Sequence, residues 1–407
     1  MVINIGSRQN RIFILYIFSL LILFLHSLYA WFLWGTQIFT IFFATGISIL
    51  LYYTSKDFFN FKKSNFVLII LLIIVQIYAV KDGNTNALIA TVLRIIIFSF
   101  LILLKDSIKI DLLHFFTKAF AILLVVSLFG WILFLFGVDL PNTIAKYGEA
   151  YGEDMYSFYN YYFFLIVNYM IDWPVPRFSG VFLEPSYLGM IATALIIANR
   201  FDFKKKSVWI FLIATLLSFS LSAYVALLIT LIAFLLIESK RPVINLFFFI
   251  LMIYFVSDYY KNLNSGENAI NNYIFKRLEW VDGKLVGDNR YSENFQDYYT
   301  RLLNSDKRYF GVGYAEYSSF AGAGNAGYKV YIVLYGIVGL LLILLFYLSI
   351  LFYNYSKSGG ILFMGYVLIF IIASYPLMDC QLMIFITAIP GLKCVNQKLE
   401  NVLQEKT

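Results

Sequence analysis

Long apolar runs, separated by short polar or basic breaks, dominate the sequence from Ile12 to Leu392. A helix needs about 20 predominantly apolar residues to cross the hydrocarbon core of a membrane. Because such runs recur along the chain, the pattern predicts an all-α polytopic membrane protein with about 12 spans in a single transmembrane domain, residues 1–407. The predicted spans are 12–31, 36–53, 65–80, 87–104, 119–137, 183–199, 207–220, 222–237, 243–257, 328–353, 361–376 and 381–392. The stretch 207–237 has a second interpretation, as one long helix instead of two short helices around "SFSLS".

The composition excludes a water-soluble globular protein. Hydrophobic residues make up 61% of the 407 positions, aromatic residues 20% and charged residues only 14%. Soluble domains carry about 25% charged residues, so this chain has too little polar surface to remain in water.

The basic residues indicate how the chain crosses the membrane. Loops rich in Lys and Arg stay in the cytoplasm, and every second predicted loop is basic, beginning with Arg8 and Arg11. This alternation predicts an even number of spans with both termini in the cytoplasm, and a first span that acts as an uncleaved anchor. The net charge of +7 is explained by this topology, and no basic stripe of the kind that binds nucleic acid is present. We therefore expect no nucleic-acid partner.

Two long segments fall on the outer side in this topology, at 138–182 and 258–327. The first contains the aromatic run "YSFYNYYFFLIVNYMIDW", which we expect to lie in the membrane interface as an amphipathic or half-buried helix. The second is long enough to form a cap. Within it, Ser292 precedes apolar residues at helical spacing, which predicts an amphipathic helix with one apolar face. These residues are Phe295, Tyr298, Tyr299, Leu302 and Leu303.

The stretch "RFSGVFLEPSYLG" places polar residues where the sixth predicted span begins on the outer side. Glu184 and Pro185 are typical of a helix start, and a helix N-terminus favours an anionic group such as a phosphate. Arg177 lies seven residues before Glu184, and Ser179 and Gly180 allow the backbone to turn between them. The alternative is purely structural, with Arg177 as an interface anchor and Glu184 pairing with it or capping the helix.

The larger outer segment contributes further cations. Arg290 and Arg301 flank the predicted amphipathic helix and precede "GVGY" and "GAGN", after which another span starts on the outer side. We expect three arginines and two helix N-termini to converge on one strongly anionic group, because a guanidinium donates two parallel hydrogen bonds to a diphosphate. The alternatives are an ion pair of Arg301 with Asp297 and of Arg290 with Asp288.

The numbers and positions of His and Cys residues exclude several catalytic and structural mechanisms. The only histidines, His26 and His114, fall in the first span and in a cytoplasmic loop, so no histidine base or zinc cluster is expected on the outer side. Cys380 and Cys394 lie on opposite sides of the membrane in this topology, which excludes a disulfide between them. No phosphate-binding loop or dinucleotide fingerprint is present, so no nucleotide cofactor is expected.

Arg94 lies well inside the fourth predicted span. An intramembrane arginine is a candidate functional residue, and Arg94 could bind a lipid phosphate from the membrane side of the outer interface. The alternative is that its side chain only extends to the interface. Ser218, Ser220 and Ser222 have two interpretations, as the polar end of a cavity or as small residues that let helices pack closely.

The stretches "RFSGVFLEPSYLG", "LLSFSLSAYVAL" and "YFGVGYAEY…GN…YGIVG" resemble, in this order, the O-antigen polymerase and ligase superfamily of bacterial inner-membrane proteins. The similarity covers about Arg177 to Leu345 together with the predicted spans. Ligases of the superfamily carry a histidine at the position where Asn325 stands here, so the resemblance favours a polymerase.

The resemblance implies a reaction at the periplasmic face. A growing polysaccharide is transferred from undecaprenyl diphosphate to a hydroxyl of a new repeat unit that is also linked to undecaprenyl diphosphate, and a chain-length regulator protein is a candidate partner. No metal is expected for the reaction that the resemblance implies, because its diphosphate is already a good leaving group. The proton of that hydroxyl would go to Glu184, or instead to Glu316 or Asp154. Tyr291 and Tyr314 would stack on sugar rings, or are interface aromatics. The alternatives in function are an O-antigen ligase that transfers polymer to lipid A core and a flippase for the lipid-linked oligosaccharide.

The sequence thus yields one set of candidate site residues on the outer side. The candidate catalytic residues are Arg177, Glu184, Arg290 and Arg301, and the candidate substrate-binding residues are Arg94, Ser179, Gly180, Tyr291, Gly313, Tyr314 and Asn325.

Overall fold

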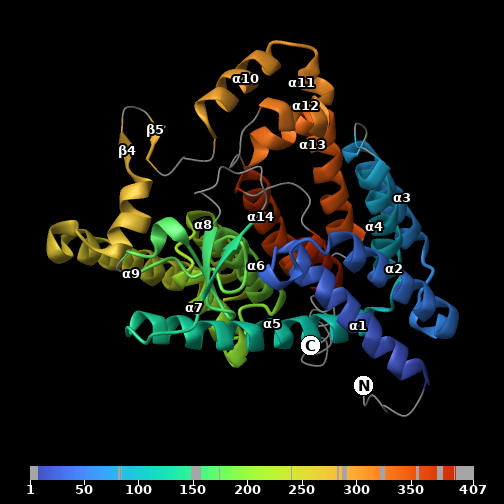
Figure 1. Cartoon of the computed structure of the whole chain (residues 1–407), viewed down its shortest axis with the longest axis horizontal. Coiled ribbons are helices and arrows are strands. Elements are labelled where there is room, and N and C mark those ends of the chain that lie inside the picture. Colours follow the sequence, from blue (N-terminus) through green and yellow to red (C-terminus); the bar gives the residue numbers. More distant parts are fainter. Residues whose placement is uncertain are drawn as a thin grey trace.

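The chain is mostly helical (Figure 1). The computed structural model describes residues 8–80, 83, 85–147, 157–173, 175–239, 241–281, 284–286, 291–320, 326–353, 357–373, 379–388 and 390. The α-helices are α1 (Arg8–Ser27), α2 (Gln37–Thr54), α3 (Lys63–Ala79), α4 (Thr85–Leu103), α5 (Asp106–Leu135), α6 (Pro185–Ala198), α7 (Lys206–Leu217), α8 (Leu221–Glu238), α9 (Pro242–Asn262), α10 (Glu293–Leu303), α11 (Lys307–Phe310), α12 (Gly313–Phe320), α13 (Tyr328–Tyr353) and α14 (Lys357–Ala373), followed by an apolar helix at Asp379–Ala388.

Each predicted span overlaps an apolar helix of the described residues. Six helices are long and apolar enough to cross a membrane: Gln9–Ser27, Gln37–Thr54, Thr85–Leu103, Asp106–Leu135, Pro242–Gly266 and Tyr328–Phe352. The other six described apolar helices contain 10 to 17 residues: Lys63–Ala79, Pro185–Ala198, Lys206–Leu217, Leu221–Ile237, Phe363–Ile372 and Asp379–Ala388. These lengths are compatible with a multi-pass membrane protein, while the number of twelve spans stays a prediction.

The stretch 207–237 forms two helices and not one. The break lies at Ser218–Ser220, where Phe219 adopts a left-handed backbone conformation with φ of 45°. The Ser220 hydroxyl then accepts a hydrogen bond from the Ala223 backbone N–H at 3.4 Å, so Ser220 is the N-cap of α8. All three serines of this stretch, including Ser222, are buried, which agrees with close helix packing.

Helix α6 lies at the centre of the helical assembly (Figure 1). It is buried from Leu188 to Ala198. A Cβ atom added at Gly189 would lie 2.7 Å from the Ser218 hydroxyl, so the glycine permits close contact between α6 and the break between α7 and α8. On another side, the Tyr366 hydroxyl of α14 donates a hydrogen bond to the Met190 carbonyl at 3.1 Å. The start of α6 is therefore held firmly by its neighbours.

The aromatic run of the first outer segment does not form the expected amphipathic helix. Strands β1 (Thr143–Lys146), β2 (Ser157–Asn160) and β3 (Leu165–Val167) form a three-stranded antiparallel sheet in the order β1-β2-β3. The prediction is wrong because the backbone of Leu165 bonds to a distant segment. Its N–H donates to the Gly180 carbonyl at 2.8 Å, and its carbonyl accepts from the Ser179 hydroxyl at 2.9 Å. Such tertiary contacts override a periodicity that is ambiguous in an almost wholly apolar run.

The amphipathic helix predicted in the second outer segment is confirmed as α10. Its N-cap is Ser292, whose hydroxyl accepts a hydrogen bond from the Phe295 backbone N–H at 3.3 Å. Phe295 and Leu302 are buried against α12 and the first turns of α13. Figure 1 shows α10, α11 and α12 together beside the end of α13. That the whole segment acts as a cap stays a prediction.

The "GVGY" stretch fits into an interruption of α13. Gly336 breaks that helix with a φ of 70°, in the left-handed region that favours glycine. A Cβ atom added at Gly311 would lie 2.5 Å from the Gly336 nitrogen, so the two backbones approach as closely as glycine allows. The Val312 N–H also donates to the Val333 carbonyl at 2.8 Å. These contacts join the large outer segment to the helical assembly.

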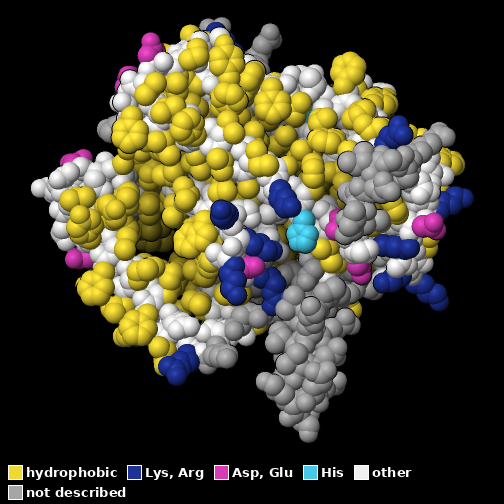
Figure 2. Space-filling model, turned by 90° about the horizontal axis from the view of Figure 1, so that it is seen from below, with side chains coloured by type: hydrophobic (Ala, Val, Ile, Leu, Met, Phe, Trp, Pro, Cys, Tyr) yellow, Lys and Arg dark blue, Asp and Glu magenta, His cyan; other side chains and the backbone are white. Residues whose placement is uncertain are grey.

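The basic residues of two predicted cytoplasmic loops, 105–118 and 200–206, lie side by side, although 106–118 forms the first turns of α5 and not a loop. His114 of α5 interacts electrostatically with Lys118 and with Lys205. The Lys205 ammonium donates to Asn199 at 3.0 Å, and the Asn199 amide donates to the Thr117 hydroxyl at 3.3 Å. Figure 2 shows Lys and Arg side chains gathered around a histidine on this face, within a largely hydrophobic surface. The cytoplasmic orientation of this face stays a prediction.

Replacing Ser292 with alanine is expected to loosen α10 locally. The substitution removes the side-chain acceptor of the helix N-terminus and lowers the free energy of unfolding the helix by about 1 kcal/mol. Amide hydrogens of α10 should then exchange about fivefold faster in hydrogen-exchange mass spectrometry. Thr300→Ala is the control, because the exposed Thr300 hydroxyl bonds only to the Gln296 carbonyl of its own helix. Unchanged exchange in Ser292→Ala would contradict the capping role.

Candidate functional site

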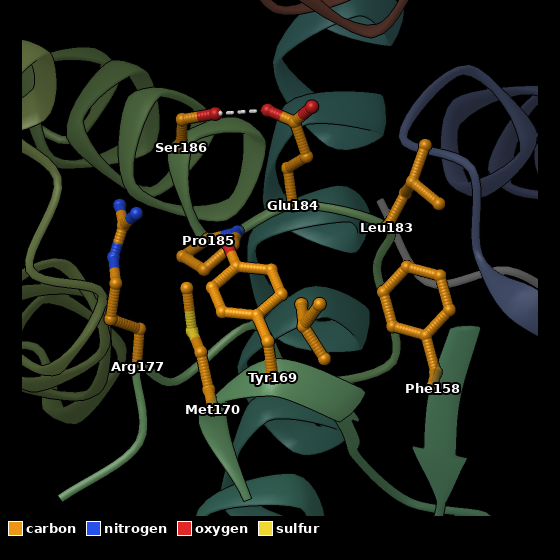
Figure 3. A pocket seen from close by; sticks show the side chains of 9 residues that line it. Phe158, Tyr169, Met170, Arg177, Leu183, Glu184, Pro185 and Ser186 are labelled. Carbon is orange, nitrogen blue, oxygen red and sulfur yellow. Dashed lines mark hydrogen bonds between the residues drawn. The ribbon is translucent and has the colours of Figure 1, made fainter. Parts of the chain in front are cut away.

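A cavity of about 180 Å³ opens at the start of α6. Figure 3 shows Arg177 on one side of it, Glu184 in the middle and the apolar side chains of Leu183 and Phe158 on the other side. The complete lining is Phe158, Val167, Tyr169, Met170, Arg177, Leu183, Glu184, Pro185 and Ser186. The cavity therefore contains a guanidinium, a carboxylate and a hydroxyl group against an apolar wall, as is typical of a binding site.

Arg177 is positioned by the break between α7 and α8. Its Nε donates a hydrogen bond to the Ser218 carbonyl at 3.0 Å, and the next residue, Phe178, donates from its backbone N–H to the Leu217 carbonyl at 3.0 Å. Burial lowers the pKa of the Arg177 guanidinium, and nearby Arg277 lowers it further, whereas Glu184 raises it. An arginine stays protonated despite such shifts. A second cation beside a partly buried guanidinium raises the local positive potential and favours an anionic ligand.

Glu184 is the N-cap residue of α6, and Pro185 follows at the first helical position as predicted. Within the described chain the Glu184 side chain does not cap the helix. Its carboxylate instead accepts a hydrogen bond from the Ser186 hydroxyl at 2.8 Å (Figure 3). The ring of Tyr169 lies between Arg177 and Glu184 in the same view, and burial raises the pKa of its hydroxyl, with Arg177 opposing the shift. The carboxylate thus reaches the cavity instead of the helix backbone.

Arg277 is the cation that the sequence interpretation missed. It lies in the 3-10 helix η6 (Lys276–Leu278), immediately after the π-helix η5 (Asn271–Phe275). Tyr273 of η5 donates from its hydroxyl to the Val175 carbonyl at 3.1 Å, and its ring stacks on Trp173 with centroids 5.3 Å apart. Both outer segments therefore meet beside Arg177. The available signal was the "KR" pair that directly follows the aromatic "NNYIF".

The predicted convergence of Arg177 with Arg301 is not found. Arg301 is exposed on α10, which Figure 1 shows well apart from α6. Among the described residues it forms no ion pair with Asp297, and it interacts electrostatically with Tyr298. Arg290 and Asn325, as well as Asp154 and Asp288, lie outside the described residues.

Other predicted substrate-binding residues are engaged within the protein. Ser179 is buried and bonds to β3, and Gly180 has a φ of 56°, so both shape the turn between Arg177 and Glu184. Tyr291 stacks on Phe295 with centroids 5.5 Å apart, and the Lys329 ammonium lies 4.6 Å from the centre of its ring.

The "GVGY" residues and Glu316 lie on the α10–α12 side of the molecule. Gly313 begins α12, and Tyr314 beside it has an exposed fraction of 61%. Glu316 accepts hydrogen bonds from the Lys307 ammonium at 2.9 Å and from the Tyr298 hydroxyl at 2.7 Å, and these bonds lower its pKa. A carboxylate held in this way is a weaker proton acceptor than one without a cationic partner.

Arg94 does not line the cavity. Its Nε lies 3.1 Å from the carboxylate of Asp379, at the start of the helix Asp379–Ala388, and the exposed fractions of the two side chains are 25% and 10%. His26 of α1 interacts electrostatically with both. Next to Asp379, the backbone N–H of Cys380 donates to the Ser27 hydroxyl at 2.9 Å. The sequence interpretation did not identify Asp379, because it lies in a short predicted loop far from Arg94 in the chain.

Comparisons of this chain with family models, curated proteins and solved structures found no match. The functional assignment therefore depends on the residues and on their geometry.

Proposed function

We propose that the protein is a polysaccharide polymerase of a bacterial inner membrane, a glycosyltransferase that uses glycans linked to polyprenyl diphosphate. The observation that carries the proposal is the cavity at the start of α6, which places Glu184 opposite Arg177, with Arg277 close to that arginine. The Arg177 guanidinium beside a helix N-terminus, together with the positive charge of Arg277 that acts on it, suits a diphosphate, and the apolar surface of the surrounding helices suits a polyprenyl chain.

The proposed reaction is a substitution at the anomeric carbon of the growing chain. The bond from this carbon to the diphosphate oxygen breaks, and a bond to the acceptor hydroxyl oxygen forms. Arg177 and Arg277 stabilise the charge that develops on the departing diphosphate, and such preorganised donors contribute most when they match the transition state. The acceptor proton passes to the Glu184 carboxylate, whose hydrogen bond from Ser186 fixes its orientation.

A second candidate is a flippase for lipid-linked oligosaccharides. It is favoured by the ion pair of Arg94 with Asp379, because charged residues inside the membrane are typical of transport pathways. The cavity favours the polymerase, since it combines a proton acceptor with cations. A ligase is the sister activity, and it differs from the polymerase in the acceptor.

Deleting the gene is expected to leave surface lipopolysaccharide with a single repeat unit. The physical reason is that export and transfer to lipid A continue while chain extension stops. Gel electrophoresis of extracted lipopolysaccharide measures the result. A ligase defect would instead leave long polymer on the lipid carrier, and a flippase defect would remove repeat units from the surface. Either of these two outcomes would contradict the proposed polymerase.

A further inference from the structure

An aromatic platform lies beside the cavity, on the side opposite Arg177. We define the platform as Tyr29, Trp34, Tyr147 and Tyr187, which come from three segments: the connection between α1 and α2, the end of β1, and α6. The Tyr29 ring lies 5.6 Å from the ring of Tyr147 and 6.0 Å from that of Tyr187, and Trp34 lies 5.0 Å from Tyr147. All four side chains are partly exposed. They are therefore neither a buried core nor scattered surface residues.

The platform is continuous with the cavity. Phe158 and Leu183 line the cavity and belong to the same apolar cluster as the platform, and the Phe158 ring lies 5.7 Å from that of Trp34. Tyr187 follows Ser186, which bonds to Glu184. In Figure 3 Glu184 stands between Arg177 and the Phe158 wall. A ligand on the platform would thus approach the carboxylate from the side away from the guanidinium.

The platform is held rigidly. The indole N–H of Trp34 donates to the Tyr29 carbonyl at 2.8 Å. Tyr29 itself has a φ of 55°, at the end of α1, where its N–H bonds to the His26 carbonyl and the N–H of Ala30 bonds to the Leu25 carbonyl. A helix that ends in this way favours glycine at the position of Tyr29. A bulky residue at this position raises the free energy of the folded state by about 1 kcal/mol or more. A strained tyrosine persists only where the surrounding structure holds it, which is typical of functional sites.

We infer that the aromatic platform binds a pyranose ring of the acceptor glycan and directs its hydroxyl toward Glu184. This inference rests on the proposed function, because it assigns the acceptor side of the same cavity. The aliphatic C–H face of a sugar carries a slight positive charge and packs on the negative face of an aromatic ring, and tyrosine hydroxyls beside it pair with sugar hydroxyls. Interface aromatics that only anchor a protein in the membrane do not need to pack around one polar cavity.

The test measures glycan binding without catalysis. The purified full-length protein in nanodiscs is titrated with the repeat-unit oligosaccharide that mild acid releases from its polyprenyl diphosphate carrier, extracted from the host strain, and binding is followed by saturation-transfer NMR. Trp34→Ala and Tyr147→Ala should each weaken binding about tenfold, whereas Trp34→Phe, which keeps an aromatic ring, should bind within about threefold of the wild type. Trp209→Ala is the matched control, because Trp209 lies on α7 and its indole bonds to the Phe203 carbonyl.

The outcomes separate this inference from the proposed function. Equal binding by Trp34→Ala, Tyr147→Ala and the wild type, or no binding by the wild type, would overturn the platform while the deletion phenotype still stood. Conversely, suppose that glycan binding depends on the aromatic rings and that the deletion strain shows the flippase phenotype. This result would support the platform as a glycan-binding site and contradict the proposed polymerase activity.

Discussion

Replacing Arg177 with alanine is expected to lower the rate of chain extension by about 10²- to 10³-fold, the effect of removing one preorganised donor from a charged transition state. Arg177 is partly buried, and its Nε is held by the Ser218 carbonyl, so its remaining N–H groups are directed before the substrate binds. Chain extension is measured in isolated membranes, as the conversion of lipid-linked repeat units into polymer. Arg177→Lys keeps the charge but loses the planar fork, and should recover only part of the rate.

Arg301→Ala is the control for this experiment. From the sequence alone, Arg177→Ala, Arg290→Ala and Arg301→Ala are each predicted to abolish chain extension, because the three arginines are expected to converge on one anionic group. The structure separates Arg301 from Arg177, since Arg301 is exposed on α10 while Arg277 lies beside Arg177. We therefore expect Arg277→Ala to lower the rate and Arg301→Ala to leave it near that of the wild type. If Arg177→Ala makes polymer of normal length and amount, with an unchanged amount of the protein in the membrane, the proposed role of Arg177 is contradicted.

Local sequence signals predicted the elements that local physics determines. The spacing from Phe295 to Leu303, together with Ser292 as N-cap, was sufficient to place α10. The Glu-Pro pair likewise marked the first turn of α6. In these cases the capping group and the apolar face lie within one helix, so no knowledge of distant contacts is needed.

The features that the sequence did not reveal depend on distant pairing. The sheet in the first outer segment forms because the backbone of Leu165 meets Gly180, and no periodicity in an aromatic run indicates that contact. The approach of Arg277 to Arg177 depends on how η5 packs on Trp173. Single-sequence patterns fix which residues share a helix face, but not which loops meet. A candidate site built from several loops is therefore only partly accessible from the sequence.

Breaking the ion pair between Arg94 and Asp379 on one side is expected to be strongly destabilising. The carboxylate has an exposed fraction of only 10%, so Arg94→Ala leaves it buried without its cation. The loss of one partner of a buried pair costs about 3–5 kcal/mol, whereas replacing both by apolar residues is often neutral. Arg94→Ala and Asp379→Ala should each lower the thermal unfolding midpoint in detergent, and Arg94→Leu combined with Asp379→Leu should restore most of the loss.

This comparison also decides between two roles of the pair. If the double apolar variant is stable and still makes long polymer, Arg94 and Asp379 serve to hold α4 against the helix Asp379–Ala388. If it is stable but inactive, the charges take part in moving or holding the lipid-linked substrate, as the flippase alternative requires. Additive losses in the single and double variants would contradict a coupled pair altogether, because independent groups have no interaction energy to recover. The stability of the double variant thus has to be measured before its activity is interpreted.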